Sequence, residues 1–168
     1  MSDTDKAGES RKAIGRTLLC VVDDTAEMSV ALQFAARRAN RTGAHVGLLF
    51  VIEQEATEFQ HWSSIGDLMR AEAQADAERV LSRAAEHIRQ WSSEPPVFYI
   101  REGDRRDAVI DQIREDPSIA FLILGAATGR EGPGPLVTAL TGRWVGQLHI
   151  PIVIVPGNVQ EEEIESFA

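Results

Sequence analysis

Lysine is scarce in this chain of 168 residues, and none follows Lys12. A P-loop needs a lysine after its last glycine to reach the phosphates, so P-loop nucleotide hydrolases are excluded. Basic residues as a whole are outnumbered, because 17 lysines and arginines stand against 26 aspartates and glutamates, for a formal net charge of −9. This balance argues against binding to nucleic acid or to an anionic membrane surface, which both require basic patches.

Cysteine and long apolar runs are lacking as well. Cys20 is the only cysteine, so no disulfide can form within the chain, and its place in an apolar run predicts a buried side chain and not a redox thiol. No apolar stretch approaches the length of a membrane span. Residues 1–10 are too polar for a signal peptide, and a cytoplasmic protein is expected.

Patterns for catalysis and metal binding are also absent. No histidine has metal-ligand spacing with Cys20 or with another histidine, and the Gly-x-Ser-x-Gly and Gly-x-Gly-x-x-Gly patterns do not occur. Glu53, Glu55 and Glu58 could form an acid–base pair, but we interpret them as an acidic loop. The sequence therefore predicts no catalytic and no metal-binding residue. The histidines are His45, His61, His87 and His149.

The chain does contain an alternation of strands and helices. Apolar runs typical of strands buried on both faces occupy residues 17–22, 45–52, 97–100, 119–124 and 150–155. Between them, apolar residues recur at helical spacing over residues 28–39, 65–91, 109–113 and 137–148. Five strands alternating with four helices predict a three-layer α/β/α fold around a five-stranded parallel sheet.

Local signals predict where several elements end. Asp24-x-x-Glu27 resembles a capping box, Gly43 is a helix stop, and Asp104 is an N-cap. Residues 1–15 are interpreted as a flexible tail, residues 16–157 as the domain, and residues 158–168 as a solvated acidic tail.

A glycine-rich loop follows the fourth predicted strand and leads into a helix. Glycine lets the backbone approach a ligand closely, and a helix N-terminus attracts anions, so the loop is a candidate phosphate site. The alternative, that glycine and proline only turn the chain, stays open. If the fourth strand lies on the other side of the first, Asp23, Asp24 and Thr25 meet Leu124 and Gly125 at a topological switch point, where ligands bind in such sheets.

The ordered set of segments 18–25, 31–39, 45–52, 121–125 and 150–155 resembles the universal stress protein family over roughly residues 16–156. The resemblance implies a Rossmann-like sheet of the adenine nucleotide α-hydrolase type with strand order 3-2-1-4-5. It also implies a homodimer formed through the last strand, which is apolar and would otherwise favour aggregation at a sheet edge. The candidate interface residues are Ile150, Ile152, Val153, Ile154 and Val155.

Family members that bind ATP carry a Gly-x2-Gly-x9-Gly-Ser/Thr loop after strand four. Gly129, Gly132 and Gly142 reproduce this spacing, but the loop from Gly125 is longer than the pattern, and Arg143 replaces the hydroxyl residue. A guanidinium at this place could bind phosphate in bidentate fashion, fill the phosphate space, or point to solvent.

The resemblance also places two further residues beside a nucleotide. Asp23 would contact it directly or through Mg²⁺, and the backbone of Val51 would meet adenine. The structural alternatives are that Asp23 only stabilises the turn after its strand and that Val51 only belongs to the core of its strand. Three functions follow: a non-catalytic regulatory homodimer with a degenerate loop, a genuine ATP-binding protein with slow hydrolysis, or an adenylating enzyme. The last would need a basic cluster at the switch point, for which Arg130 and Arg143 are the candidates.

Overall fold

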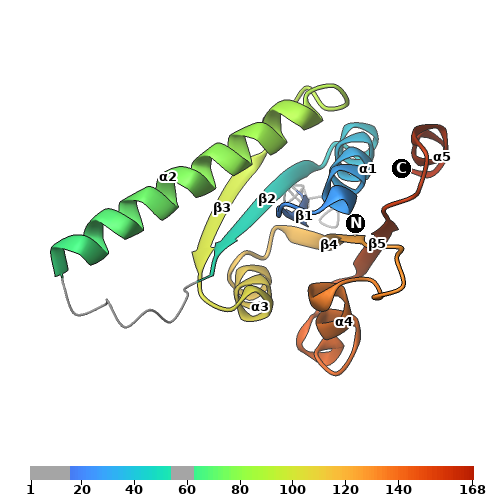
Figure 1. The fold of residues 1–168 in the computed structure, drawn as a ribbon. Coiled ribbons are helices and arrows are strands. Elements are labelled where there is room, and N and C mark those ends of the chain that lie inside the picture. Colours follow the sequence, from blue (N-terminus) through green and yellow to red (C-terminus); the bar gives the residue numbers. More distant parts are fainter. Residues whose placement is uncertain (1–15, 54–62) are drawn as a thin grey trace, which may run out of the picture.

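A computed structural model describes residues 16–53 and 63–168 of the chain. Its core is a parallel sheet with the order β3-β2-β1-β4-β5, which confirms the predicted fold and strand order (Figure 1). The strands are β1 (Thr17–Val21), β2 (His45–Ile52), β3 (Val97–Glu102), β4 (Ile119–Ala126) and β5 (Ile152–Pro156). The helices are α1 (Ala26–Thr42), α2 (Ser63–Ile88), α3 (Arg105–Glu115), α4 (Pro135–Thr141) and α5 (Glu161–Phe167).

The central strands are apolar on both faces because helices cover both faces of the sheet. Leu48 and Leu49 are neighbours in β2, yet each is fully buried on its own side. Leu48 packs in the core under α1 and α2, whereas Leu49 packs in the core under α3 and α4. The alternation of side chains along a strand thus divides one continuous apolar run between two cores.

Some predicted ends are confirmed and others are wrong. Gly43 ends α1 in the left-handed region, with φ 68°, and the Asp104 carboxylate accepts the Asp107 N–H at the start of α3. The capping box between Asp24 and Glu27 does not form. The N-cap of α1 is Thr25, whose N–H donates to the Asp23 carboxylate, because an Asx turn takes the place of the box.

The helix predicted over residues 137–148 is shorter in the structure. It ends at Thr141, Gly142 is its C-cap, and a single 3-10 turn covers Val145–Gln147. Trp144 therefore lies outside α4, although it still packs against the core under α3 and α4. Glycine at position 142 is a poor helix former, and this stops the helix halfway along the apolar pattern.

α2 also differs from its predicted apolar face. It ends at Ile88, before Trp91, and only its second half packs on the sheet, where Leu81 and Ile88 are buried. The first half runs past the ends of the strands (Figure 1), so Met69, which belongs to the apolar periodicity of residues 65–91, is 52% exposed.

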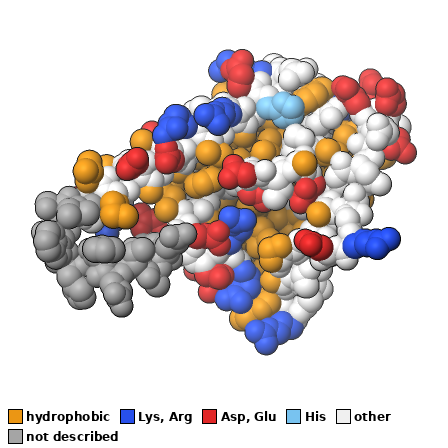
Figure 2. Space-filling view, viewed as in Figure 1, with side chains coloured by type: hydrophobic (Ala, Val, Ile, Leu, Met, Phe, Trp, Pro, Cys, Tyr) orange, Lys and Arg blue, Asp and Glu red, His pale blue; other side chains and the backbone are white. Residues whose placement is uncertain are grey.

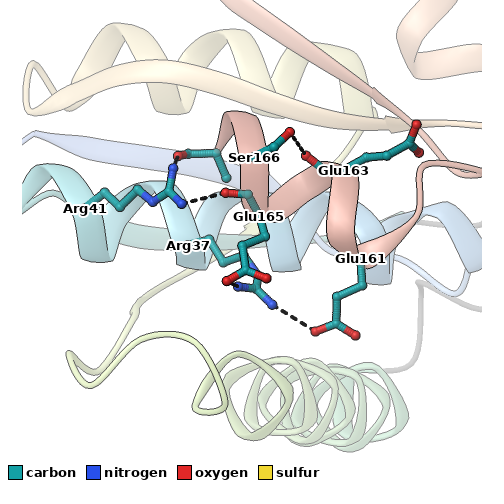
Figure 3. A network of polar contacts seen from close by, with 7 residues as sticks. Arg37, Arg41, Glu161, Glu163, Glu165 and Ser166 are labelled. Carbon is teal, nitrogen blue, oxygen red and sulfur yellow. Dashed lines mark hydrogen bonds and ion pairs between the residues drawn. The ribbon is translucent and has the colours of Figure 1, made fainter.

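The interpretation of residues 158–168 as a solvated tail is wrong for this segment. Residues 161–167 form α5, which packs on α1 and buries Ile164 completely. Arg41 of α1 donates to the carbonyl oxygens of Glu165 and Ala168, and Arg37 pairs with Glu161 at 2.8 Å (Figure 3). The glutamates themselves are exposed. Because they dominate the composition of the segment, the sequence predicts a solvated tail and not a helix with one apolar side.

Candidate functional site

The predicted site residues come from the carboxyl ends of β1, β2 and β4, which neighbour one another in the sheet. Val51 and Leu124 are both buried side chains of the core under α3 and α4. Their side chains therefore serve the core, and only their backbone is available to a ligand. The burial of Val51 is compatible with both expectations from the sequence, strand core and a backbone contact with adenine.

Asp23 lies directly after β1 and is the most constrained polar residue of this edge. Its Oδ1 accepts the Thr25 N–H at 2.9 Å and the Thr25 hydroxyl at 2.5 Å. Its Oδ2 lies 3.9 Å from an Nη1 of Arg105, whose Nη2 donates to the Glu53 carboxylate at 2.8 Å. The switch point therefore holds a chain of carboxylate, guanidinium and carboxylate.

Sequence reasoning missed Arg105. It stands at the first position of α3, after the Gly103 turn with φ 119°, and it follows the carboxyl end of β3. Because the carboxyl ends of parallel strands meet at one edge of a sheet, Arg105 had to lie on the same edge as Asp23. The signal for Arg105 in the sequence is therefore its place directly after the third strand, at the same sheet edge as the ends of β1 and β4.

Gly125 is glycine for a reason of packing. It lies inside β4, and a Cβ there would stand 2.6 Å from the backbone oxygen of Glu27 in the first turn of α1. Gly157, just after β5, likewise would place a Cβ 2.8 Å from the Glu27 Cβ. The N-terminal turn of α1 therefore rests directly on the ends of β4 and β5, and a side chain at either glycine would displace it.

The glycine-rich loop closes on itself. The Ala127 N–H donates to the Pro133 carbonyl at 3.3 Å, and the Gly132 N–H donates to the Gly129 carbonyl at 3.4 Å. Gly132 and Gly134 have φ of 90° and 101°, values that residues with a side chain rarely adopt. The turn of the chain thus accounts for both glycines. The N–H groups of Ala127 and Gly132, which could otherwise bind an anion, already donate hydrogen bonds within the loop.

Gly142 and Arg143 follow α4 and do not precede it. The C-terminal end of a helix carries partial negative charge, which disfavours phosphate. The Arg143 side chain is exposed, and its Cζ lies 5.2 Å from the ring centre of Trp144; the Cζ of Arg106 lies 4.2 Å from the same ring. In the described part of the chain Arg143 has no carboxylate partner. Stacking on Trp144 is thus its observed role.

Three of the candidate residues also line a groove. Asp23, Asp24 and Thr25 line a groove of about 320 Å³ between α1 and α2, whose lining includes neither Val51 nor Arg143 nor any glycine of the loop. This groove therefore does not join the two halves of the site inferred from sequence.

Metal and thiol chemistry find no support in residues 16–53 and 63–168. No group of three His, Cys, Asp or Glu side chains in these ranges could hold a metal ion. Burial raises the pKa of the Cys20 thiol to about 12, so it stays protonated and inert. Glu55, Glu58 and His61 lie outside the described residues. None of the described helices is long and apolar enough to cross a membrane.

Comparison with known proteins gives one family and one fold. The profile of the Universal stress protein family matches residues 15–156. No curated protein matches the sequence significantly. Among solved structures, universal stress protein UspA from Lactobacillus plantarum is similar with a TM-score of 0.69 and 17% identity, over 83% of this chain and 97% of that chain.

Two further structures are similar and were solved with nucleotides. A universal stress protein in complex with cAMP has a TM-score of 0.59 and 13% identity, over 83% of this chain and 96% of that chain. A family protein from Arabidopsis thaliana with AMP bound has a TM-score of 0.58 and 13% identity, over 88% of this chain and 94% of that chain. At such identities the likeness concerns the fold alone.

Proposed function

Because the chain belongs to the Universal stress protein family, we propose that it is a non-catalytic regulatory protein of the stress response. In this proposal it acts as a homodimer, and its glycine-rich loop is a degenerate form of a nucleotide-binding loop. The observation that carries the proposal is the pair of bonds from Ala127 to Pro133 and from Gly132 to Gly129, which close the loop on itself.

The nucleotide part is tested on purified protein. Denaturation is expected to release no adenine nucleotide, and calorimetric titration with ATP and Mg²⁺, AMP or cAMP is expected to give no saturable heat at millimolar concentration. Released nucleotide or a saturable heat would contradict the degenerate loop. Arg143→Ser is expected to leave this result unchanged, since Arg143 follows the C-terminal end of α4.

The second candidate is a genuine adenine nucleotide-binding protein, with ATP, AMP or cAMP as ligand. It is favoured by the nucleotides bound to the two relatives and by Arg105, a cation at the switch point beside Asp23. If this candidate holds, Arg105→Gln should weaken nucleotide binding about tenfold or more. Arg114→Gln is the matched control, because Arg114 lies on the same helix and pairs with Asp111, its one ion-pair partner in the described part of the chain.

An adenylating enzyme of the same fold group ranks third. Such an enzyme needs a cluster of free cations for pyrophosphate at the switch point, whereas Arg105 is already held between Glu53 and Asp23. Product formation from ATP and a carboxylic acid would favour it over both other candidates.

The homodimer is supported by the exposed edge of β5. This strand pairs with β4 on one side only, and its Ile154 is 41% exposed. Ile154→Lys is expected to convert the dimer to a monomer in light scattering, because a lysine there would be desolvated in the interface. Val97→Lys, on the opposite sheet edge with 42% exposure, is the matched control and should leave the dimer intact. A dimer that survives Ile154→Lys contradicts pairing through β5.

A further inference from the structure

The groove between α1 and α2 is an amphipathic cavity that shares only residues 23–25 with the predicted nucleotide site. Its floor is apolar and comes from Met28 and Leu32 of α1 and from Val80 and Ala84 of α2. Figure 2 shows hydrophobic side chains open to the surface between the charged ones along α2. With about 320 Å³, the groove is large enough for a small organic molecule.

Opposite charges stand at the two ends of this floor. Both helices follow strands of one parallel sheet, so both run from the carboxyl edge of the sheet toward its amino edge. Asp24 precedes α1 and lies at the carboxyl end of the groove, whereas Arg83 and His87 come from the last two turns of α2 and lie farther along. The groove is therefore acidic at one end and basic at the other.

Among the described residues, the arginine at the basic end has no ion-pair partner, unlike the other arginines of its segment. Arg70, Arg79 and Arg89 of the same segment each pair with a carboxylate three residues earlier. Three residues before Arg83 stands Val80, and the neighbouring Glu86 is bonded to Arg89. Within the described ranges no carboxylate pairs with Arg83.

The acidic end is likewise open. Asp23 is engaged by Thr25 and by Arg105, but no described residue binds the carboxylate of Asp24. Asp24 is exposed and carries the uncompensated negative charge of this end. An apolar floor between two uncompensated charges of opposite sign complements a molecule with the reverse arrangement.

We propose that this groove binds a small zwitterion whose ammonium and carboxylate stand at opposite ends of an apolar body, as in an ω-amino acid. The carboxylate binds Arg83 and His87, the ammonium binds Asp24, and the aliphatic body covers Leu32 and its apolar neighbours. A simple anion would pair with Arg83 but would find no attractive charge at the Asp24 end. A simple cation would pair with Asp24 but would find no attractive charge at the Arg83 end, so each would make one favourable charge interaction and not two. The inference is independent of the proposed function, because no residue of the glycine loop takes part.

Three probes of matched length test the charge pattern. In calorimetric titration, 6-aminohexanoate is expected to bind saturably at millimolar concentration, and hexanoate and hexylamine to bind about tenfold or more weakly. The proposal is overturned if 6-aminohexanoate does not bind at this concentration, or if either singly charged probe binds as tightly.

Two variants locate the binding. Arg83→Gln should weaken 6-aminohexanoate about tenfold or more and leave hexylamine unchanged, whereas Asp24→Asn should weaken 6-aminohexanoate and leave hexanoate unchanged. Arg79→Gln, an arginine of α2 that pairs with Asp76 outside the groove, is the control and should change nothing. An equal loss in Arg79→Gln and Arg83→Gln overturns the site. Nucleotide titration of Arg83→Gln should match that of the unchanged protein, which separates this result from the test of the loop.

Discussion

Tyr99 in β3 donates its phenolic O–H to Oδ2 of Asp116, 2.7 Å away at the end of α3. The other carboxylate oxygen of Asp116 accepts the Ser118 N–H at 2.9 Å, and the Ser118 hydroxyl lies 3.1 Å from that of Thr17 in β1. To reach Asp116, Tyr99 passes Gly47 of β2. One polar cluster therefore joins β1, β3 and the turn between α3 and β4.

Removal of the phenolic hydroxyl should weaken this cluster. Tyr99→Phe keeps the ring but deletes a hydrogen bond to a carboxylate, so we expect the free energy of unfolding to fall by about 1–2 kcal/mol. Urea denaturation measures the change. Phe98→Tyr is a useful control, since residue 98 is exposed and gains no such partner. An unchanged denaturation midpoint in Tyr99→Phe would show that water replaces the bond at no cost.

The same bond makes stability depend on alkaline pH. Burial, followed by the hydrogen bond to Asp116, raises the pKa of Tyr99 from 10.0 to about 12. A pKa raised on folding means that the stabilisation is complete below about pH 10 and is lost as the pH rises toward 12. Tyr99 is the only tyrosine of the chain, so tyrosinate absorbance reports it directly. We expect the titration midpoint of tyrosinate absorbance at about pH 12 in the folded protein and at about pH 10 in urea. Equal midpoints would contradict the hydrogen bond from Tyr99 to Asp116.

Gly47 provides the space through which Tyr99 reaches Asp116. A Cβ at this position would stand 2.8 Å from Cγ2 of Thr17 and 2.9 Å from Cε2 of Tyr99, in the middle of a buried strand. Gly47→Ala should therefore destabilise the fold by about 1–3 kcal/mol, as overpacking does in other cores. Gly66→Ala is the matched control, because nothing lies within 4 Å of its added Cβ. Since Gly66 is inside α2, the control should gain about 0.5–1 kcal/mol; a loss in both variants would contradict the crowding argument.

The attachment of α5 should depend on one side chain. Ile164 is fully buried against α1, so Ile164→Ala removes most of the apolar contact of a seven-residue helix. We expect amide exchange over residues 161–167 to quicken at least tenfold while exchange in β1 and β4 stays unchanged, since the helix opens locally. Glu162→Ala is the control, because Glu162 is exposed on the same helix. Equal exchange in the two variants would mean that Arg37, Arg41 and the contact between Phe34 and Phe167 hold α5 without Ile164.

The strands and several helix ends could be predicted because one local signal decides each of them. Residues 45–52 form a continuous apolar run and are observed as β2 with the predicted bounds. Gly43 and Asp104 act through their own backbone or side chain, so their effect needs no distant partner. The division of the chain into five strands has the same local origin.

The predictions that failed depend on contacts between distant residues. Ile164 and Phe167 are the apolar side chains of residues 161–167 that contact the rest of the fold, and both contacts require α1 to lie beside α5. The packing reason for Gly125 could not be predicted either, because its neighbour Glu27 is remote in sequence. Arg105 was missed because only the sheet brings it to Asp23.

By itself, the sequence determined the α/β class, the sheet order through the family resemblance, and the absence of the P-loop pattern, because these depend on apolar periodicity and on the residue types present. Only the tertiary structure decided that the glycine loop closes on itself, that Arg143 follows α4, and that Arg83 and Asp24 line one groove without an ion-pair partner in the described ranges. The physical reason is that hydrogen bonds and ion pairs depend on distances of a few ångströms, which the packing of helices on the sheet sets and the spacing of residues along the chain does not.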